Sequence, residues 1–351
     1  MRNNKLIIPI AFCFFMVATV SAQVIDIKHK QRNPKYVKDF YKHHLILRAF
    51  ECTKFNNFKL IDESDKLVYK PNRHNDLGLG FNYRALSLNL EFNIPVTEKS
   101  SKIYGVTHTF DLQTYIYIDK FLIDLYSQFY RGYYLSNTEE ALTGNPTSRV
   151  LVRPDMKTVD LSLNVQYVLN DRHFSFNAPF FQNEIQKKSA GSPLIGAGVY
   201  YMHGKTDSSF IPTHINYINF FQDHLFNRFN YLSIGVNLGY AYTCVIKKQF
   251  FITGALSGGP GIGYSTINNT QSTYKNDRLG IAWNATAKFA AGWSNDKYFA
   301  GVTYIRLIVQ SNSAVADTKQ QTNAGNFMFT VADRFKLRRS LIPKSGIIRM
   351  E

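Results

Sequence analysis

The stretch that decides the fold is MKTVDLSLNVQYVL, residues 156–169. Its apolar and aromatic side chains fall on one face of an extended chain, namely Val159, Leu161, Leu163, Val165, Tyr167 and Leu169. Its polar side chains fall on the other face, namely Thr158, Asp160, Ser162, Asn164 and Gln166. Such alternation predicts a β-strand with one apolar and one polar face. The predicted strand is longer than the about five or six residues usual in soluble sheets.

The same period of two recurs along the rest of the chain. It is clear in 106–118, 230–243 and 278–293, and weaker in 77–94, 121–134, 173–181, 193–203, 248–264, 297–309 and 325–337. We therefore predict about 12 strands after residue 77. The segment 77–94 changes phase near Ala85, which indicates either a bulged strand or two strands joined by a very tight turn.

Two folds can contain long amphipathic strands: a soluble β-sandwich and a transmembrane barrel. The polar faces here carry Gly, Ser, Thr, Asn and isolated charges, unlike a solvent-facing coat of Lys and Glu. Aromatic residues gather toward the strand ends, as in the girdles of membrane barrels; they include Tyr240, Tyr242, Tyr264, Trp293, Tyr298 and Phe335. These features favour an all-β fold, an antiparallel transmembrane β-barrel. Short and long connections alternate as expected, except in 182–229, where two longer connections follow each other.

The amino terminus predicts a cleaved signal peptide over residues 1–22. Two basic residues precede an apolar run at 6–20, which is shorter than the roughly 20 residues that a spanning helix needs. Residues 23–76 form a more basic segment that is either periplasmic, a first strand or a plug. We assign 77–337 to the barrel and 338–351 to a polar tail. The predicted location is the outer membrane.

Cysteine and histidine usage predicts no metal site and no cofactor. Cys52 and Cys244 remain after cleavage and could pair, but two distant cysteines are no disulfide framework. His108 falls on an apolar face, where a lipid-modifying enzyme would need it beside a nucleophile, and no serine is tied to it by sequence. The glycine-rich stretch 258–263 lacks the Lys-Ser/Thr ending of a phosphate loop, which favours small residues that relieve curvature in a strand.

Four segments carry a family resemblance. Residues 69–72 (YKPN), 77–84 (LGLGFNYR), 129–134 (FYRGYY) and 173–192 (HFSFNAPFFQNEIQKKSAGS) resemble the Bacteroidota family of outer-membrane barrels named as domain of unknown function 4421. The resemblance covers most of residues 40–337. It implies an outer-membrane barrel, assigns no activity, and gives no catalytic residues to carry over.

The last of these segments holds the candidate functional residues. It is polar and does not alternate, which places it off the lipid-facing surface. We predict site residues Gln182, Glu184, Gln186, Lys187, Lys188 and Ser189. In one interpretation Glu184, Lys187 and Lys188 form a charged constriction in a loop or the lumen. In the other, the segment is a structural loop that satisfies its own hydrogen bonds.

The charge of +16 indicates the partners. A basic chain in this compartment is expected to meet outer-membrane lipids including lipopolysaccharide, and the barrel assembly machinery. No nucleic-acid module is present. The leading functional hypothesis is a small pore, transporter or surface scaffold whose solute is unknown. The alternatives are a lipid-modifying enzyme of the acyl hydrolase type and a secreted soluble β-sandwich.

Overall fold

The computed structural model describes residues 24–27, 32–40, 44–73, 75–83, 86–94, 96–118, 120–142, 150–269, 275–338 and 347–350. The predicted signal peptide lies outside these residues. Two short strands, β1 (Val24–Ile27) and β17 (Ile347–Met350), form a separate parallel pair.

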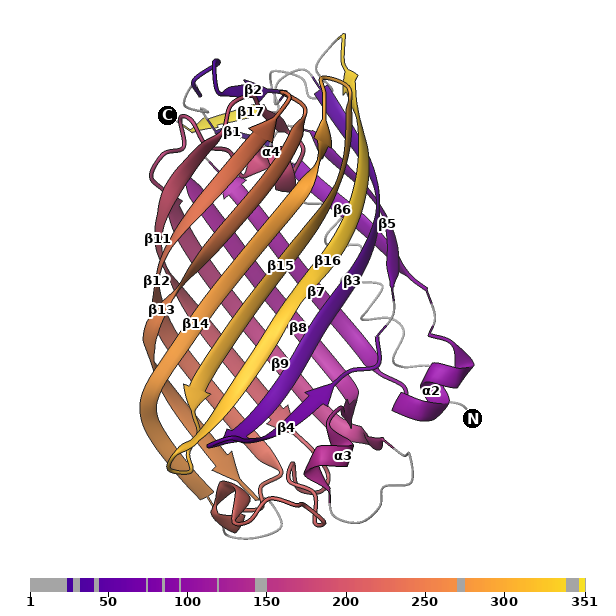
Figure 1. The fold of residues 1–351 in the computed structure, drawn as a ribbon, viewed down its shortest axis with the longest axis vertical. Coiled ribbons are helices and arrows are strands. Elements are labelled where there is room, and N and C mark those ends of the chain that lie inside the picture. The colour runs from indigo at the N-terminus through magenta and orange to yellow at the C-terminus, as the bar shows by residue number, and fades with distance from the viewer. Residues whose placement is uncertain are drawn as a thin grey trace.

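Ten antiparallel strands close into a barrel (Figure 1). In order around the wall they are β3 (His44–Asp62), β4 (Asp65–Lys70), β8 (Phe121–Leu135), β9 (Leu151–Val168), β11 (Ala190–Lys205), β12 (Arg228–Ile246), β13 (Phe250–Asn268), β14 (Lys275–Ser294), β15 (Tyr298–Asn312) and β16 (Thr318–Lys336). Pairing of β16 with β3 along both whole strands closes the ring. The predicted barrel class is confirmed. The wall begins at His44, within the segment for which a first strand was one of the alternatives.

Three further strands join this wall without completing it. They are β5 (Asp76–Tyr83), β6 (Leu86–Asn93) and β7 (His108–Ile118). β5 pairs with β3, β6 with β5, and β7 with β8. The predicted count of about 12 strands is therefore corrected to ten closing strands and three added ones. Two strands occupy 77–94, so the second alternative for that segment is correct.

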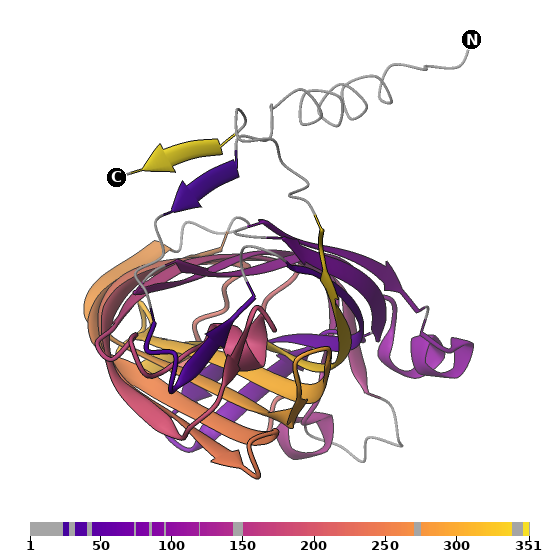
Figure 2. The same ribbon diagram turned by 90° about the horizontal axis from the view of Figure 1, so that it is seen from above.

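Between β6 and β7 the wall has a break. No backbone pairing joins these two strands among the residues described. Figure 2 shows β5 and β6 leaving the ring on the side of helix α2 (Glu98–Tyr104). The short strand β4 bridges the gap at one end only, because it pairs with β8 through Tyr69 and Lys70 alone.

One end of the barrel is covered by a cap. We call this the cap end, where β9 ends and β11 begins. The cap consists of β2 (Val37–Asp39) paired with β10 (Glu184–Gln186), together with α4 (Asn177–Phe180). Segment 173–181 was predicted as a strand, and this is wrong: Phe174 and Phe176 are alternately spaced because both rings pack in the cap core. One capped connection thus joins β9 to β11, which removes the irregularity in 182–229.

The opposite end, the loop end, carries the longer connections. It holds α3 (Thr138–Ala141) and η1 (Phe220–Asp223). Rings from strands and loops pack there into one buried cluster that includes Phe58, Tyr69, Phe210, Phe226 and Phe229. Both ends of the barrel are therefore filled by side chains.

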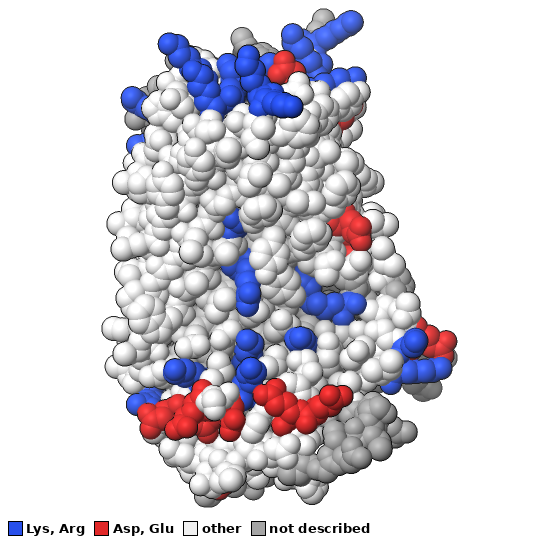
Figure 3. Space-filling view, in the orientation of Figure 1, with Lys and Arg blue, Asp and Glu red and all other residues white. Residues whose placement is uncertain are grey.

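The polarity of the wall is the reverse of that in a water-soluble protein, which has polar side chains outside and apolar side chains inside. Large apolar side chains point outward and are exposed, with Leu256, Ile262 and Leu279 each about two-thirds accessible. Inward side chains are polar and buried, with Asn164 and Gln128 at most 1% exposed. Figure 3 shows a broad, largely uncharged surface with a few charged side chains within it, with Lys and Arg gathered above it and a row of Asp and Glu below.

Candidate functional site

The predicted site residues lie in the cap. Gln182, Glu184 and Gln186 are buried. The Glu184 carboxylate accepts hydrogen bonds from Arg32 Nε over 2.7 Å and from the hydroxyl of Ser175. Burial opposes the charge on Arg32, but Glu184 and Tyr117 raise the pKa of its guanidinium above the ordinary value. The Gln186 side chain donates to the carbonyl of His173 over 2.6 Å.

The remaining predicted residues do not face Glu184 as partners. Lys187 is exposed, and its Nζ donates to the carbonyl of Pro34 over 2.7 Å. Lys188 lies over the Tyr36 ring at 5.7 Å. Ser189 accepts a hydrogen bond from the Val245 amide over 2.9 Å. The structure thus gives each residue a bonding role in the cap, and a functional constriction there stays a prediction.

A different group of residues surrounds a cavity at the break in the wall. The cavity has a volume of about 190 Å³. It is lined by Lys54, Asn72, Arg73, Asp76, Glu91, Thr109, Phe110, Asp111 and Tyr130. Strands β3, β5, β6, β7 and β8 all contribute, so the cavity occupies the space between the two unpaired edges. Exposed Thr109 and Phe110 show that it reaches the outer surface.

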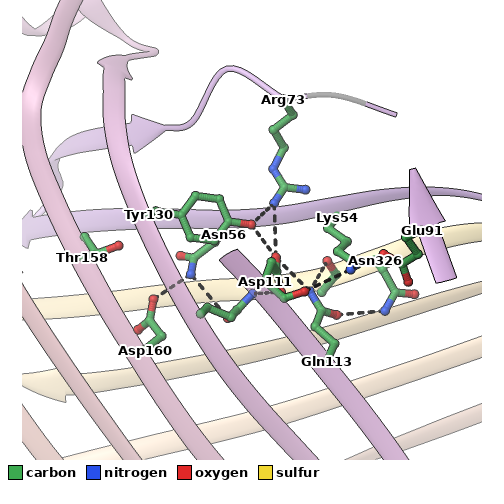
Figure 4. A network of polar contacts seen from close by, with 12 residues as sticks. Lys54, Asn56, Arg73, Glu91, Asp111, Gln113, Tyr130, Thr158, Asp160 and Asn326 are labelled. Atoms are coloured by element: carbon green, nitrogen blue, oxygen red, sulfur yellow. Dashed lines mark hydrogen bonds and ion pairs between the residues drawn. The ribbon is translucent and has the colours of Figure 1, made fainter. Parts of the chain in front are cut away.

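Asp111 is the centre of the polar contacts around this cavity (Figure 4). One carboxylate oxygen accepts from Gln128 Nε2 over 2.9 Å. The other accepts from the Tyr130 hydroxyl and from Gln113 Nε2, the latter over 3.3 Å. The Asp111 side chain is only 6% exposed. Its negative charge is therefore held by donors of the protein itself.

Lys54 bridges the two edges of the break. Its Nζ lies 2.5 Å from the Glu91 carboxylate on β6 and donates to the Asp111 carbonyl on β7 over 3.0 Å. A side chain from β3 thus takes the place of the missing backbone pairing. The contact depends on two side-chain interactions, which separate more readily than a ladder of backbone hydrogen bonds.

Arg73 lines the cavity and has hydrogen-bonding capacity that the described residues do not use. Its Nη2 donates to the Tyr130 hydroxyl over 2.6 Å and lies 3.8 Å from an Asp111 oxygen. Its Nε and Nη1 are buried, and neither has a hydrogen-bond partner within the described part of the chain. A buried polar group without a partner is costly, and a guanidinium presents its donors in a geometry that suits carboxylate and phosphate.

Local sequence features hold Arg73 in this position. The backbone N–H of Asn72 donates to the Thr107 hydroxyl over 2.8 Å, and the Asn72 side-chain amide donates to the Gly105 carbonyl over 2.7 Å. The Thr107 hydroxyl donates to the Gly132 carbonyl over 2.8 Å. Gly132 has a φ of +93° and forms a bulge, after which β8 stops pairing with β7. These contacts bind the segment before Arg73 to the β7–β8 pair.

The same network continues into the barrel interior. Gln113 donates to the Gly325 carbonyl of β16 over 3.2 Å, and Asn326 Nδ2 donates back to Gln113 Oε1 over 2.9 Å. Asn56 Nδ2 donates to Gln128 over 3.3 Å and to Asp160 over 2.6 Å. The cavity therefore lies at the outer end of a continuous polar network.

The lining of the cavity supplies cations, carboxylates, an amide and hydroxyl groups, which can bind a ligand. His108 is exposed at the start of β7 and forms no hydrogen bond with a serine among the residues placed in the structure. Over the same residues, no cluster of His, Cys, Asp and Glu could hold a metal ion. No helix in the described ranges is long and apolar enough to cross a membrane. Cys52 and Cys244 are both free.

Sequence reasoning predicted none of the cavity residues as a site. The alternation in 106–118 places Asp111 on the polar face, where the structure also has it. Lys54 and Arg73 lie in the segment that was left open between plug and strand. Lys54 is one of five charged residues along β3, so no sequence pattern singles it out, and none marks Arg73.

The fold and sequence were compared with known proteins. No protein of curated function matches the sequence. The outer membrane protease OmpT of Escherichia coli has a TM-score of 0.34 at 8% identity, over 84% of this chain and 97% of that chain. The translocator domain of autotransporter NalP of Neisseria meningitidis has a TM-score of 0.33 at 10% identity, over 82% and 88%. The outer membrane protein OprG of Pseudomonas aeruginosa has a TM-score of 0.20 at 12% identity, over 84% and 98%.

The family is established by sequence. Residues 33–335 match the family described as Domain of unknown function (DUF4421), as the segments at 69–84, 129–134 and 173–192 predicted, and the chain belongs to that family.

Proposed function

We propose that the protein is an outer-membrane barrel that takes up an amphipathic molecule with an acidic head group through the cavity in its wall. Placement in the outer membrane is supported by the apolar outward face, the polar interior and the predicted signal peptide. Short turns at 247–249 and 295–297 lie at the cap end. Because outer-membrane barrels have short turns on the periplasmic side, we assign the cap end to the periplasm and the loop end to the cell exterior.

The observation that carries the proposal is that two nitrogens of the Arg73 guanidinium, Nε and Nη1, have no hydrogen-bond partner among the described residues, in a side chain that lines the cavity at the break between β6 and β7. A carboxylate or phosphate there would supply the partners that Nε and Nη1 lack. Phe110 at the rim of the cavity is 60% exposed, and Leu90 and Phe92 of β6 are exposed to a similar degree. These side chains offer an apolar path for a tail from the lipid phase.

Entry from the side fits the packing of the barrel better than passage along its axis. Asp124, Asn164, Gln166 and Asn237 lie inside the wall and are each 1% exposed, so these side chains are packed against the protein and do not line an open channel. This favours the transporter hypothesis over the open pore. The acyl hydrolase and the soluble sandwich have no such observation in their support.

Membrane placement is tested by fractionation. We expect the protein to be extracted from outer membranes only by detergent and to migrate faster on gels before boiling than after. Recovery in the soluble fraction without a heat-dependent shift would contradict the placement.

Ligand binding is tested with dodecanoate on the protein purified in dodecyl maltoside, using titration calorimetry. Arg73→Gln is expected to weaken binding about tenfold or more, because hydrogen bonds to a charged group contribute about 1.5–3 kcal/mol. Arg278→Gln on β14 makes the same charge change far from the cavity and should leave binding unchanged. Equal binding of dodecanol, or no effect of Arg73→Gln, would contradict an acidic-head-group site.

A further inference from the structure

A row of basic residues crosses four neighbouring strands near the loop end. The strand register places Arg131 of β8 opposite Lys157 of β9. Lys157 is opposite Lys205 of β11, and Lys205 is opposite Arg228 of β12. We call these four residues the cation row. Strands lie ~4.8 Å apart, so the row extends over roughly 14 Å of the wall.

The cation row faces outward at the edge of the apolar band. Arg131, Lys157 and Lys205 are exposed, and their chain neighbours Tyr130, Thr158 and Gly204 are buried inside. Two residues farther toward the cap end, the outward position on β8 is Phe129, which is 43% exposed. The row therefore lies where the apolar surface ends.

An outward apolar surface follows the row on the other strands as well. Leu161 of β9 and Leu232 of β12 are 40% and 47% exposed on the same outer face. Lys205 is the last residue of β11 and Arg228 is the first of β12. A molecule bound to the row would therefore contact charge on its loop side and apolar surface on its other side.

This arrangement is unfavourable for the protein alone. Like charges directly opposite each other on neighbouring strands destabilise a sheet. No ion pair joins any member of the row to a carboxylate within the described ranges. The nearby Asp155 is instead bonded to Arg153 and to the Thr206 hydroxyl. Arg228 Nε is buried, and none of the residues described accepts a hydrogen bond from it.

Basic residues also lie near the loop end on the neighbouring strands β4 and β3. Lys59 of β3 is opposite Val68 of β4, so Lys66 and Lys70 share its outward face. Lys59 interacts electrostatically with these two lysines and with Arg306 of β15. On the face drawn in Figure 3, basic side chains lie between the uncharged band and the acidic band below it.

We propose that the cation row binds the phosphates of a diphosphorylated glycolipid head group, of the lipid A type, in the leaflet at the loop end. The inference rests on the membrane placement proposed above and not on the side cavity. A lipid of this kind complements both parts of the surface, because its phosphates bind the cations while its acyl chains cover the apolar band. Two phosphates on a saccharide can contact cations along the row, whereas a single phosphate contacts one or two.

The test uses protein purified in dodecyl maltoside and titrated with diphosphoryl lipid A, with bound lipid counted by native mass spectrometry. Lys157→Gln/Lys205→Gln is expected to bind about 25-fold more weakly, since each cation near an anionic lipid surface contributes about fivefold in affinity and the variant removes two. Lys157→Arg/Lys205→Arg should retain binding, which separates loss of charge from loss of folding.

The matched control is Lys247→Gln/Lys248→Gln, two exposed lysines in a turn at the cap end. It makes the same change of charge and should bind lipid A as the wild type does. Equal weakening in this control would overturn the proposal, because the effect would then be one of net charge. Equal affinity for phosphatidylglycerol would overturn the requirement for two phosphates.

Failure here is distinguishable from failure of the side cavity. Arg73→Gln should leave lipid A binding unchanged, and Lys157→Gln/Lys205→Gln should leave dodecanoate binding unchanged. If both variants weakened both probes to the same extent, neither surface would be a separate site. Absence from the outer membrane in the fractionation would remove the basis of both proposals.

Discussion

At the scale of single residues, the most consequential contact in the interior is the ion pair between Asp124 and Lys288. The Lys288 Nζ lies 2.6 Å from Asp124 Oδ1, and the two side chains are 4% and 1% exposed. The ammonium also lies 5.2 Å from the centre of the Tyr115 ring. A pair this deeply buried resists the loss of either partner, because the remaining charge would have no counterion and no water.

The prediction is that Lys288→Met lowers the free energy of unfolding by about 3–5 kcal/mol, the usual cost of leaving one buried charge unpaired. Urea unfolding in detergent micelles measures this. The double variant Asp124→Leu/Lys288→Met removes both charges and should recover most of the loss. A single variant as stable as the wild type would show that the pair is not isolated from water.

At the scale of elements, β8 determines where the wall opens. It pairs with β7 up to Arg131 and with β4 from Tyr134, and Gly132 forms the bulge between them. A Cβ atom at Gly132 would lie 2.3 Å from the Val106 carbonyl oxygen. Only glycine combines the positive φ with this close approach.

Gly132→Ala is therefore expected to destabilise the barrel by about 1–3 kcal/mol from backbone strain, before the steric clash is added. Gly254→Ala on β13 is the matched control, because a Cβ there meets no atom within 4 Å. The shift in the midpoint of urea unfolding should be large for the first variant and small for the second. Similar shifts would mean that the bulge tolerates a side chain.

At the scale of the whole molecule, the sequence was sufficient to predict a barrel but not to predict which strands pair to close it. Alternation reports which side chains face outward, and this held for β9, β12 and β14 because each has one apolar face. The same signal misled at Phe174 and Phe176, whose spacing reflects a packed cap. Alternation also carries no information about which strands pair, so the break between β6 and β7 was not predictable.

The candidate site also contains residues whose position follows from a local sequence pattern and residues whose position does not. Asp111 belongs to a regular strand, and its polar face could be predicted from its neighbours. Arg73 lies outside any strand and reaches the cavity because Asn72 and Thr107 bind its segment to β7 and β8. Such contacts join residues that are distant in sequence, and a local pattern does not record them.

The packing of the whole barrel makes a prediction about conduction. Thr243 and Thr253 are buried at the cap end, Asn164 and Asn237 in the middle, and the aromatic cluster fills the loop end. In planar bilayers we expect no steady conductance from the wild-type protein. Arg32→Ala/Glu184→Ala, which removes the ion pair of the cap, should also remain closed because the middle of the barrel is unchanged. Heat-dependent migration of the reconstituted protein controls for insertion. Steady ohmic conductance by the wild type would contradict the packed interior, and conductance by the variant alone would assign closure to the cap.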